Sequence, residues 1–392
     1  MPLDPKRTVR ELRELQELTG NADGAQRVAW TDTWVAAQEW MAGKLDGIEM
    51  EFDEARNQWW TLPGVSDKVL VIGGHLDSVP NGGWLDGALN VVAGSEVLRR
   101  LVSWADEEGA RFGRSLFGSS AAAGSMADQD ELRGRKDAEG VSLPDAIGPH
   151  GVDLDSALEA RKQLENAAAY LELHIEQGPV LERAGIDLGI VTGIVGLLGF
   201  RARFVGEANH AGTTPMELRR DALAGASRAV LSLRDEARGR DDMTANVGMC
   251  TVEPGGFNVI PGVAEFSVDV RSPTAEGFSR AEQFVRTTLA AIAEEEGLDL
   301  ELEETHRLQP VPLDSAIQDV LERAAEHEGA THMRLPSGAG HDAMIVGRHV
   351  PAGMLFVPSR GGISHSPAEY TAPEQCELGA RVLARALAEL VA

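Results

Sequence analysis

The chain has 392 residues, more than one hydrophobic core usually accommodates, so we expect two domains. Its 62 acidic and 36 basic residues leave a net charge of −26, which excludes nucleic acid and membrane surfaces as partners because both are anionic. The two cysteines, Cys250 and Cys376, cannot build a disulfide framework, and neither an apolar signal region nor a run of ~20 apolar residues occurs. We therefore expect a soluble, cytoplasmic protein.

The first part of the chain alternates predicted helices and strands. Hydrophobic periodicity predicts a helix at 8–18, a helix at 31–45, strands at 48–55, 57–64 and 68–74, and a helix at 87–104. The run KVLVIGG at 68–74 is short and continuously apolar, which is typical of a buried parallel strand. His75 then follows a strand and Asp86 precedes a helix, the positions at which open α/β sheets place ligands.

The next strand is predicted at 168–176 and contains His174. The Gly- and Ala-rich stretch before it, from Gly109 onwards, predicts mixed helix and loop, with a helix near 155–167. The end of the chain again has an α/β pattern, with a helix at 314–329, a buried strand at 352–358 and a helix at 372–391.

The pattern changes between these two regions. Strands that alternate apolar and polar residues predict a sheet with one solvated face. The elements are a strand at 200–206, a helix at 217–237, strands at 244–253 and 264–271, a helix at 274–297 and a strand at 298–305. This βαββαβ order predicts a ferredoxin-like α+β unit. We expect an α/β domain formed by 1–196 and 309–392, with a ferredoxin-like domain inserted at 197–308.

Candidate metal ligands are spread along the larger domain, each where a predicted strand or helix gives way to a loop. They are His75 and Asp86 in HLDSVPNGGWLDG, Glu107 and Glu108 in DEEG, His174 in LELHIEQG and His365 in GGISHSP. Singly, each has an ordinary interpretation as a turn, capping or surface residue. Together they supply imidazoles, carboxylates and one spare acid, the inventory of a two-metal hydrolytic site. Asp77, two residues after His75, can accept the second ring N–H of that histidine.

Motifs along nearly the whole chain resemble the hydantoinase/carbamoylase branch of the M20 metallopeptidase-like amidohydrolases. That branch includes N-carbamoyl-L-amino acid hydrolases, β-ureidopropionase and allantoate amidohydrolase. The motifs are, in order, HLDSVPNGGWLDG, DEEGARFG, ELHIEQGPVLE, GEANHAGTTPMELRRDA, FNVIPG with VDVR, SGAGHDAM and VPSRGGISHSPAEYT. HIEQGP and HAGTTPM are specific to the branch. The resemblance implies a metallopeptidase-like α/β catalytic domain with an inserted dimerisation or lid domain, and a homodimer formed through that domain.

The resemblance also assigns the catalytic centre. It implies two divalent metal ions per subunit, with Asp86 bridging them and with the remaining ligands His75, His174, Glu108 and His365. Glu107 would be the general base that takes a proton from the attacking water and passes it to the leaving nitrogen, and Asp77 would orient His75. The mixed nitrogen and oxygen ligands suit zinc, manganese, cobalt or nickel.

The implied substrate is a small anionic ureido compound. Gln177 would contact the ureido group, and His210 of the inserted domain would polarise the scissile carbonyl from the partner subunit. Asn258 and Arg271 would bind the substrate carboxylate, Arg271 through a bidentate fork. Without the resemblance, His210 is equally a surface histidine, and Arg271 an exposed ion pair with Glu265 or Asp269 on the same side of its strand.

The substrate itself stays open between two ureido compounds. PSRGGISHSPAEYT favours an N-carbamoyl-L-amino acid, hydrolysed to release ammonia and carbon dioxide, whereas GEANHAG and WTDTWVAAQ are closer to allantoate amidohydrolases. HIEQGP argues against a dipeptidase or aminoacylase, and the presence of Glu107 with Glu108 argues against an inactive binding protein. Ser120 stands where family members often have Arg. His341 and Asp342 open a predicted helix, for which we expect Asp342 to act as a cap.

Overall fold

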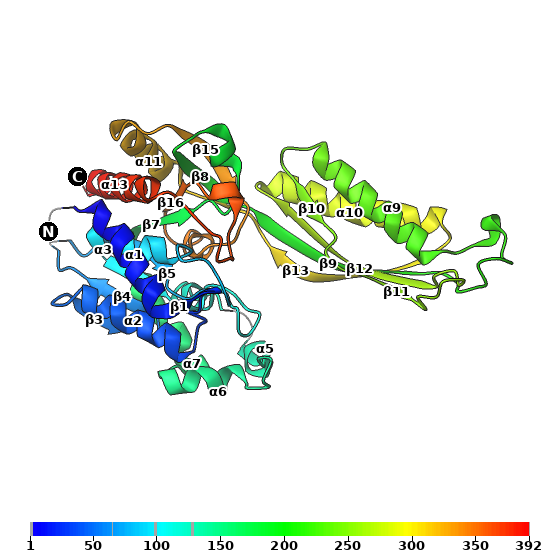
Figure 1. Ribbon diagram of the computed structural model, residues 1–392, viewed down its shortest axis with the longest axis horizontal. Coiled ribbons are helices and arrows are strands. Elements are labelled where there is room, and N and C mark those ends of the chain that lie inside the picture. The colour runs from blue at the N-terminus through cyan, green and yellow to red at the C-terminus, as the bar shows by residue number, and fades with distance from the viewer. Residues whose placement is uncertain (1–2, 65, 98–99, 127–128, 392) are drawn as a thin grey trace. The chain divides into compact units, whose positions relative to one another are not determined.

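The computed structural model describes residues 3–64, 66–97, 100–126 and 129–391. The chain divides into two compact units, which Figure 1 shows with their elements labelled. Unit 1 consists of Met1–Thr192 and Leu313–Ala392, and unit 2 is Gly193–Pro312. Unit 2 contains the segment 197–308 expected to be inserted and extends four residues beyond it at each end; strand β8 (Leu188–Ile194) crosses the first boundary.

Unit 1 is built on a nine-stranded sheet whose centre is four parallel strands in the order β16–β7–β5–β6. These strands are β5 (Val69–His75), β6 (Arg100–Trp104), β7 (Ala167–Ile175) and β16 (Ala352–Val357). Every residue of β6 and β16 is buried, as expected of parallel strands that are covered on both faces. Antiparallel strands β4 (Gln58–Thr61) and β3 (Glu49–Phe52) extend the sheet beyond β6, and antiparallel strands β8 and β14 (Val311–Pro312) extend it beyond β16. Strand β15 (His332–Ser337) also pairs with β8.

Helices cover this sheet and bury a large apolar cluster with it. The long ones are α1 (Pro5–Thr19), α2 (Asp32–Lys44), α3 (Ala88–Glu96), α11 (Ser315–His327) and α13 (Pro373–Leu390). Short helices are spaced along the stretch before β7, namely α4 (Phe117–Ala122), α5 (Gln129–Gly134), α6 (Leu143–Ile147) and α7 (Leu154–Ala157). The helix expected near 155–167 is therefore only α7 followed by a 3₁₀ segment, Leu158–Leu164. A small ribbon of β1 (Gly20–Asn21) and β2 (Gly24–Ala25) follows α1.

The predicted helix over 87–104 is wrong in its second half. Helix α3 ends at Glu96, and Arg100–Trp104 form β6, which pairs in parallel with β5 and antiparallel with β4. The segment VLRR between α3 and LVSW contains neither glycine nor proline, so the sequence does not mark the end of the helix. Burial between two strands decides it, since Leu101, Val102 and Trp104 are fully buried. Glu107 and Glu108 consequently follow a central parallel strand rather than a helix.

Three strands on the other side of the sheet were not expected from the sequence. The run LGIVTGI of β8 contains two glycines, which weakens its strand signal. Strands β14 and β15 are short and both pair with β8, so their existence depends on a neighbour that is distant in the sequence.

Unit 2 is an antiparallel sheet with two helices in the order expected for a ferredoxin-like unit. Its elements are β9 (Gly196–Val205), α9 (Ala222–Arg238), β10 (Thr244–Asn246), β11 (Cys250–Glu253), β12 (Val263–Ser272), α10 (Ala275–Glu295) and β13 (Asp299–Leu308). The strand order is β10–β12–β9–β13, and β11 also pairs with β12, so the strand expected at 244–253 is two short strands. Helix α9 begins five residues later than expected because Asp221 caps it by accepting the N–H groups of Leu223 and Ala224.

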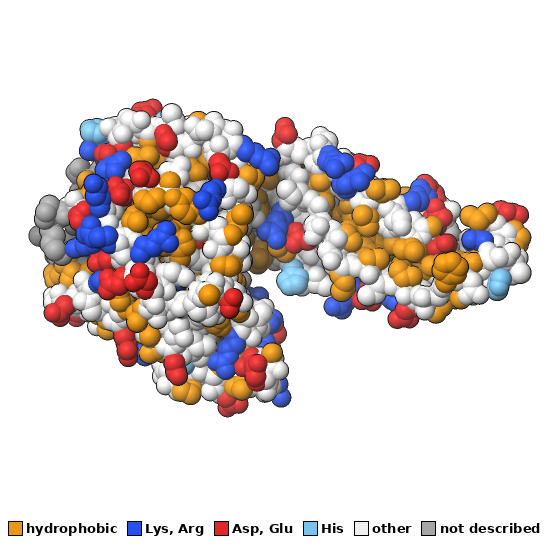
Figure 2. All heavy atoms as spheres, viewed as in Figure 1, with side chains coloured by type: hydrophobic (Ala, Val, Ile, Leu, Met, Phe, Trp, Pro, Cys, Tyr) orange, Lys and Arg blue, Asp and Glu red, His pale blue; other side chains and the backbone are white. Residues whose placement is uncertain are grey.

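The surface mixes charges of both signs. On the visible face of each unit, acidic and basic side chains are interspersed rather than gathered by sign (Figure 2). No helix of the described chain is long and apolar enough to cross a membrane.

The central position of β6 generates a stability prediction. Leu101 is fully buried in the unit 1 core, so we expect Leu101→Ala to destabilise the protein by about 2–5 kcal/mol through lost burial and a cavity. Leu62→Ala is the matched control, since that side chain is 40% exposed. Differential scanning calorimetry of both variants measures the difference. Equal melting temperatures for the two variants would contradict a central buried strand at this position.

Candidate metal centre

Four parallel strands bring the predicted ligands to one edge of the sheet. His75 ends β5, and Glu107 and Glu108 follow β6. His174 lies at the end of β7, and His365 lies in the loop after β16. Because the strands run in the same direction, their carboxyl ends meet at the same edge, which is where open α/β sheets bind ligands.

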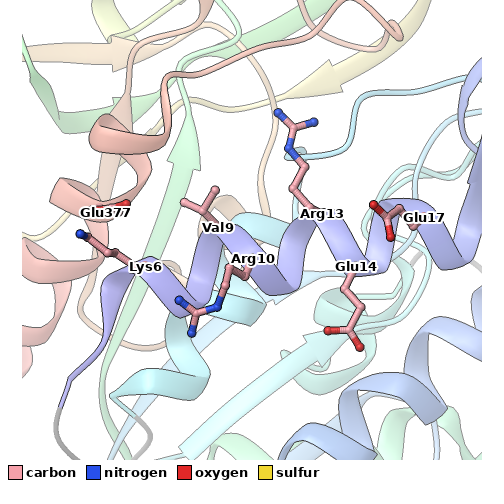
Figure 3. A pocket seen from close by; sticks show the side chains of 7 residues that line it. All are labelled: Lys6, Val9, Arg10, Arg13, Glu14, Glu17 and Glu377. Carbon is pink, nitrogen blue, oxygen red and sulfur yellow. The ribbon is translucent and has the colours of Figure 1, made fainter.

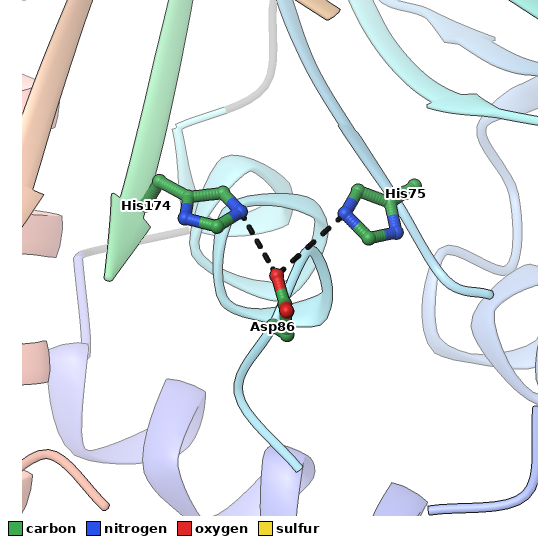
Figure 4. A group of neighbouring side chains, drawn as sticks. All are labelled: His75, Asp86 and His174. Atoms are coloured by element: carbon green, nitrogen blue, oxygen red, sulfur yellow. Dashed lines mark ion pairs between the residues drawn. The ribbon is translucent and has the colours of Figure 1, made fainter. Parts of the chain in front are cut away.

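Asp86 lies at the centre of this edge, just before α3 (Figure 4). Its Oδ1 atom is 3.1 Å from Nε2 of His174 and 3.8 Å from Nε2 of His75. Its Oδ2 atom is 3.2 Å from Nε2 of His365, which in turn is 3.5 Å from Oε2 of Glu108. One carboxylate therefore stands between two separate groups of potential ligands.

Gly87 permits the close approach of His75 to this carboxylate. Its φ is +63°, and a Cβ atom at this position would lie 2.3 Å from Nε2 of His75. Any residue with a side chain is therefore excluded both by backbone conformation and by space.

Backbone carbonyl groups determine that Nδ1 is a protonated ring nitrogen in two of the histidines. Nδ1 of His75 is 3.1 Å from the carbonyl oxygen of Asp77, and Nδ1 of His174 is 2.8 Å from that of Ile175. A carbonyl can only accept, so each Nδ1 carries a proton, and each Nε2, which points towards Asp86, is the nitrogen left to bind a cation. This is the tautomer that a metal ligand requires.

These residues fit two divalent cations. Ligands bound at about 2.1 Å to one ion lie roughly 3–3.5 Å from one another, which is close to the spacings around Asp86. The two candidate groups that share Asp86 are His75 with Asp86 and His174, and Asp86 with Glu108 and His365. Oε1 of Glu108 is buried and has no hydrogen-bond partner, as expected of an oxygen that faces a cation. The donor set is the mixture of nitrogen and oxygen that binds zinc, manganese, cobalt or nickel.

Glu107 lies against the first of these groups. Its Oε2 atom is 3.6 Å from Nε2 of His75, and its side chain is largely buried. Burial raises the pKa of Glu107 well above its ordinary value, which makes its carboxylate a stronger base. Asp77 accepts the N–H group of Glu108 at 3.1 Å through Oδ2, while its Oδ1 is 3.6 Å from Nδ1 of His75. Asp77 therefore connects the β5 and β6 loops as well as facing the histidine.

Gln177 lies directly beside Asp86. Its Nε2 donates to Oδ2 of Asp86 at 2.9 Å and to Oγ of Ser364 at 3.0 Å. Gln177 and His365 have φ values of 56° and 52°, in the left-handed region that side chains usually avoid. Such backbone strain persists only where surrounding contacts enforce it, and it is concentrated at functional sites.

The expected substrate residues of unit 2 form two separate groups. His210 pairs with Val259 across a β-bridge, and the N–H of Ala211 donates to the carbonyl of Asn258, so His210 and Asn258 are neighbours. Arg271 instead lies near the far end of β12, eight residues beyond Val263, which corresponds to about 26 Å along a strand. There its guanidinium donates to both carboxylate oxygens of Asp269, at 3.1 and 3.3 Å. This is one of the ion pairs that the exposed face of β12 had suggested.

The expectation that Asp342 caps its helix is wrong. Asp342 is the first residue of α12 (Asp342–Val346), and the N-cap position is taken by His341, which makes no side-chain capping bond. His341 is buried, with Nε2 2.9 Å from Oγ of Ser337 and its ring 4.5 Å from that of His174. It is therefore a neighbour of a candidate ligand.

Two buried charged residues of the site were missed by the sequence analysis. Glu369 follows His365 by four residues and is 2% exposed. Arg27 is fully buried and donates through Nε to the carbonyl of Leu76, at the turn between His75 and Asp77. Burial lowers the pKa of Arg27 to about 10, whereas the nearby carboxylates, Asp77 first among them, act to raise it. The only sequence signal for Glu369 was its place in the motif SHSPAEYT, and Arg27 stands in no predicted element.

A groove of about 520 Å³ outside this edge carries no comparable chemistry. Side chains of α1 and of the start of α13 line it (Figure 3), and they are Lys6, Val9, Arg10, Arg13, Glu14, Glu17 and Glu377. Cations and carboxylates are equally represented, so the groove has no preference for a charged ligand.

Comparisons with known proteins agree with this geometry. Residues 71–389 of the chain match the sequence model of the family described as "Peptidase family M20/M25/M40". It is 38% identical to an N-carbamoyl-L-amino acid amidohydrolase of Geobacillus stearothermophilus, over 96% of this chain and 96% of that protein. It is also 38% identical to an allantoate amidohydrolase of Bacillus subtilis (strain 168), over 96% of this chain and 95% of that protein.

A solved structure gives the same assignment. A hydantoinase/carbamoylase family amidase from Burkholderia multivorans superposes with a TM-score of 0.88 at 34% identity, covering 98% of this chain and 97% of that one. The family match covers most of the chain, and the relatives align over nearly their full length. The chain belongs to peptidase family M20/M25/M40, with the amidohydrolases of the hydantoinase/carbamoylase group as its relatives.

Proposed function

We propose that this protein hydrolyses the ureido C–N bond of an N-carbamoyl-L-amino acid and releases ammonia and carbon dioxide. The observation that carries the proposal is the Asp86 carboxylate between two ligand groups, with Glu107 beside one of them. Allantoate is the second candidate substrate, because an allantoate amidohydrolase is as similar to this chain as an N-carbamoyl-L-amino acid amidohydrolase. Both compounds present a ureido group and a carboxylate, so the same residues serve either.

The metal centre would consist of two divalent ions per subunit. His75 and His174 would hold one ion and Glu108 and His365 the other, with one oxygen of Asp86 directed to each. Such ions, when bound, supply Lewis acidity that polarises a carbonyl and makes water nucleophilic at neutral pH.

Glu107 is the proposed general base. Its carboxylate takes a proton from the water whose oxygen bonds to the ureido carbon, and delivers that proton to the nitrogen as the C–N bond breaks. The raised pKa caused by its burial supports both steps, because a group that accepts and then donates one proton works best near the operating pH. Gln177, beside Asp86, is placed to donate a hydrogen bond to the ureido group.

The remaining substrate contacts are assigned to unit 2. His210 would stabilise the charge that develops on the scissile carbonyl, Asn258 would lie next to it, and Arg271 would bind the carboxylate. A separation of about 26 Å along β12 is too large for one small substrate, so His210 and Arg271 of one chain would serve different active sites.

This arrangement requires a homodimer, which we propose to form through unit 2. Several large apolar side chains of unit 2 are exposed, among them Met216, Leu218, Leu231 and Phe257. Figure 2 shows hydrophobic side chains at the surface of this unit. Apolar surface of this kind is typical of interfaces between protein chains.

The proposed activity predicts ammonia release from the metal-loaded protein. We expect turnover of N-carbamoyl-L-amino acids or of allantoate, tested side by side, and a 10²–10⁴-fold lower kcat in Glu107→Gln, because the amide cannot accept the proton. A coupled ammonia assay measures both. Metal content should be retained in the variant.

Glu159→Gln, an exposed residue outside the site, is the control and should turn over normally. Absence of ammonia from every ureido substrate with metal bound would refute the activity. Unchanged turnover in Glu107→Gln would refute its role as base.

Protonation of the ligands predicts a steep pH dependence of metal affinity. The hydrogen bond to Asp86 raises the pKa of His365 to about 9, and burial raises that of Glu108 to about 7 in the metal-free protein. Both must lose their proton to bind a cation, so affinity should fall as the pH is lowered. The expected fall is at least about tenfold per pH unit between 9 and 7 and steeper below 7, because the neighbouring carboxylates also raise the pKa of His75 and of His174.

Isothermal titration with Mn²⁺ or Zn²⁺ from pH 6 to 9, in two buffers of different ionisation enthalpy, gives the affinity and the number of protons released. An affinity that does not change over this range would show that the ligands are already deprotonated.

The proposed role of Arg271 predicts that the protein recognises its substrate through the substrate's carboxylate. Because lysine cannot form the bidentate fork, we expect Arg271→Lys to raise KM about 10–100-fold with little change in kcat. Arg201→Lys is the matched control. Arg201 lies on β9, on the same face of the sheet as Arg271, and pairs with Glu303. An N-carbamoyl amino acid amide, which lacks the carboxylate, should show no difference between Arg271→Lys and the unchanged protein. An equal loss with the amide substrate would place Arg271 outside the carboxylate site.

A further inference from the structure

Glu369 joins the two loops that carry Asp86 and His365. Its Oε1 atom accepts the backbone N–H groups of Leu85 at 3.0 Å and Asp86 at 3.1 Å. Its Oε2 atom accepts the hydroxyl of Ser364 at 2.9 Å. The buried carboxylate of Glu369 therefore fixes both the backbone at Asp86 and Ser364, the residue next to His365. In the sequence, Asp86 and Ser364 are 278 positions apart, and Leu85 and Glu369 are 284 positions apart.

Ser364 continues this connection to the side chain of Asp86. Its Oγ is 3.3 Å from Oδ2 of Asp86, the oxygen that faces His365. Gln177 donates through Nε2 to the same Oδ2 and to Ser364. The orientation of Oδ2 is thus set by a network that leads to Glu369, whereas Oδ1 faces His75 and His174 directly.

The loop before Asp86 is shaped to admit the Glu369 side chain. A Cβ atom at Gly83 would lie 2.0 Å from the carboxyl carbon and Oε1 of Glu369. Gly83 does not adopt the left-handed backbone conformation, so it is the lack of space for a side chain that requires glycine here. The backbone of this loop therefore lies in direct contact with the carboxylate.

Burial of Glu369 beside Asp86 has an energetic cost that a purely structural role does not explain. Two neighbouring carboxylates repel each other, and a buried one loses its hydration. An apolar residue of similar volume would avoid both costs but could not accept two N–H groups and a hydroxyl. The hydrogen bonds of Glu369 thus offset part of the cost and fix the geometry of both loops.

We propose that Glu369 is a positioning residue that sets the ion site formed by Asp86 Oδ2, Glu108 and His365. Its loss would weaken that ion selectively, since the site of His75 and His174 uses the other oxygen of Asp86 and two histidines fixed by their own backbone contacts. The inference rests on the proposed function only in requiring that this cluster binds metal.

The test is a titration of metal-free protein with Co²⁺, followed by calorimetry and by the visible absorption of the bound ion. We expect two binding events in the unchanged protein. In Glu369→Ala and Glu369→Asp, the second should weaken about 10–100-fold and its absorption band should change, because aspartate keeps the charge but not the reach. Glu369→Gln, whose carbonyl still accepts the N–H groups of Leu85 and Asp86, should recover most of the affinity.

Two further variants keep the test decisive. Ser364→Ala retains Glu369 and is expected to fold, with the same selective loss on a smaller scale. Glu374→Ala, an exposed residue at the start of α13, is the control and should bind both ions normally. Normal binding of both ions by Glu369→Ala and Ser364→Ala would overturn the proposal. An equal loss of both ions that follows the melting temperature would also overturn it, since that result indicates a general structural role.

Failure of the proposed function can be distinguished from failure of this inference. The titration uses no ureido substrate, so it reports on Glu369 whether or not ammonia is released. If the unchanged protein binds two ions but turns over no ureido compound, the activity is refuted. The selective loss in Glu369→Ala would then still support the positioning role.

Discussion

Asp86 divides its two carboxylate oxygens between two groups of ligands, and the rest of the site is arranged around that division. Oδ1 faces the histidines that end β5 and β7, and Oδ2 faces His365 in the loop after β16. This geometry requires the loop before α3 to pass close to the ends of the strands and to hold the Asp86 carboxylate at a fixed position beside them. Gly87 allows the entry by leaving room for His75, and α3 begins directly after it.

Negative charge is the main electrostatic constraint on this edge of the sheet. The carboxylates of Asp77, Asp86, Glu107, Glu108 and Glu369 lie close together and are buried or nearly so. Buried carboxylates are tolerated only where cations or hydrogen bonds compensate them. Arg27 supplies one fixed cation below the turn at Leu76, and two divalent ions would supply the remainder. The strain at Gln177 and His365 fits a site that surrounding contacts hold in place before any ligand arrives.

Unit 2 contributes a different kind of constraint, because a β-strand keeps its ends apart. His210 and Asn258 are held together by backbone hydrogen bonds at one end of the sheet, and Arg271 lies near the other. A strand of this length separates the proposed substrate residues into two groups, which is the physical reason why the proposed site draws on two chains. The same strand alternates buried and partly exposed residues, so its polar face is available for recognition while its apolar face forms the core of the unit.

The sequence by itself was sufficient for the elements whose periodicity is strong and for naming the candidate ligands that the structure brings together. Helices α1, α11 and α13, strands β5, β7 and β16 and the order of elements in unit 2 follow from local patterns of apolar residues. His75, Asp86, Glu108, His174 and His365 were selected because each follows or precedes an element next to glycine or proline. Their spatial grouping could be expected, since the carboxyl ends of parallel strands share an edge.

Only the tertiary structure decided the features that depend on distant neighbours. Residues 100–104 became β6 because β5 and β4 flank them on both sides, while no glycine or proline in the sequence separates them from α3. Glu369 and Arg27 gained their positions from contacts with residues 49 to 284 places away, for which periodicity has no signal. The separation of Arg271 from His210 likewise required the register of β12 against its partners, because a linear sequence does not say which end of a strand lies near which loop.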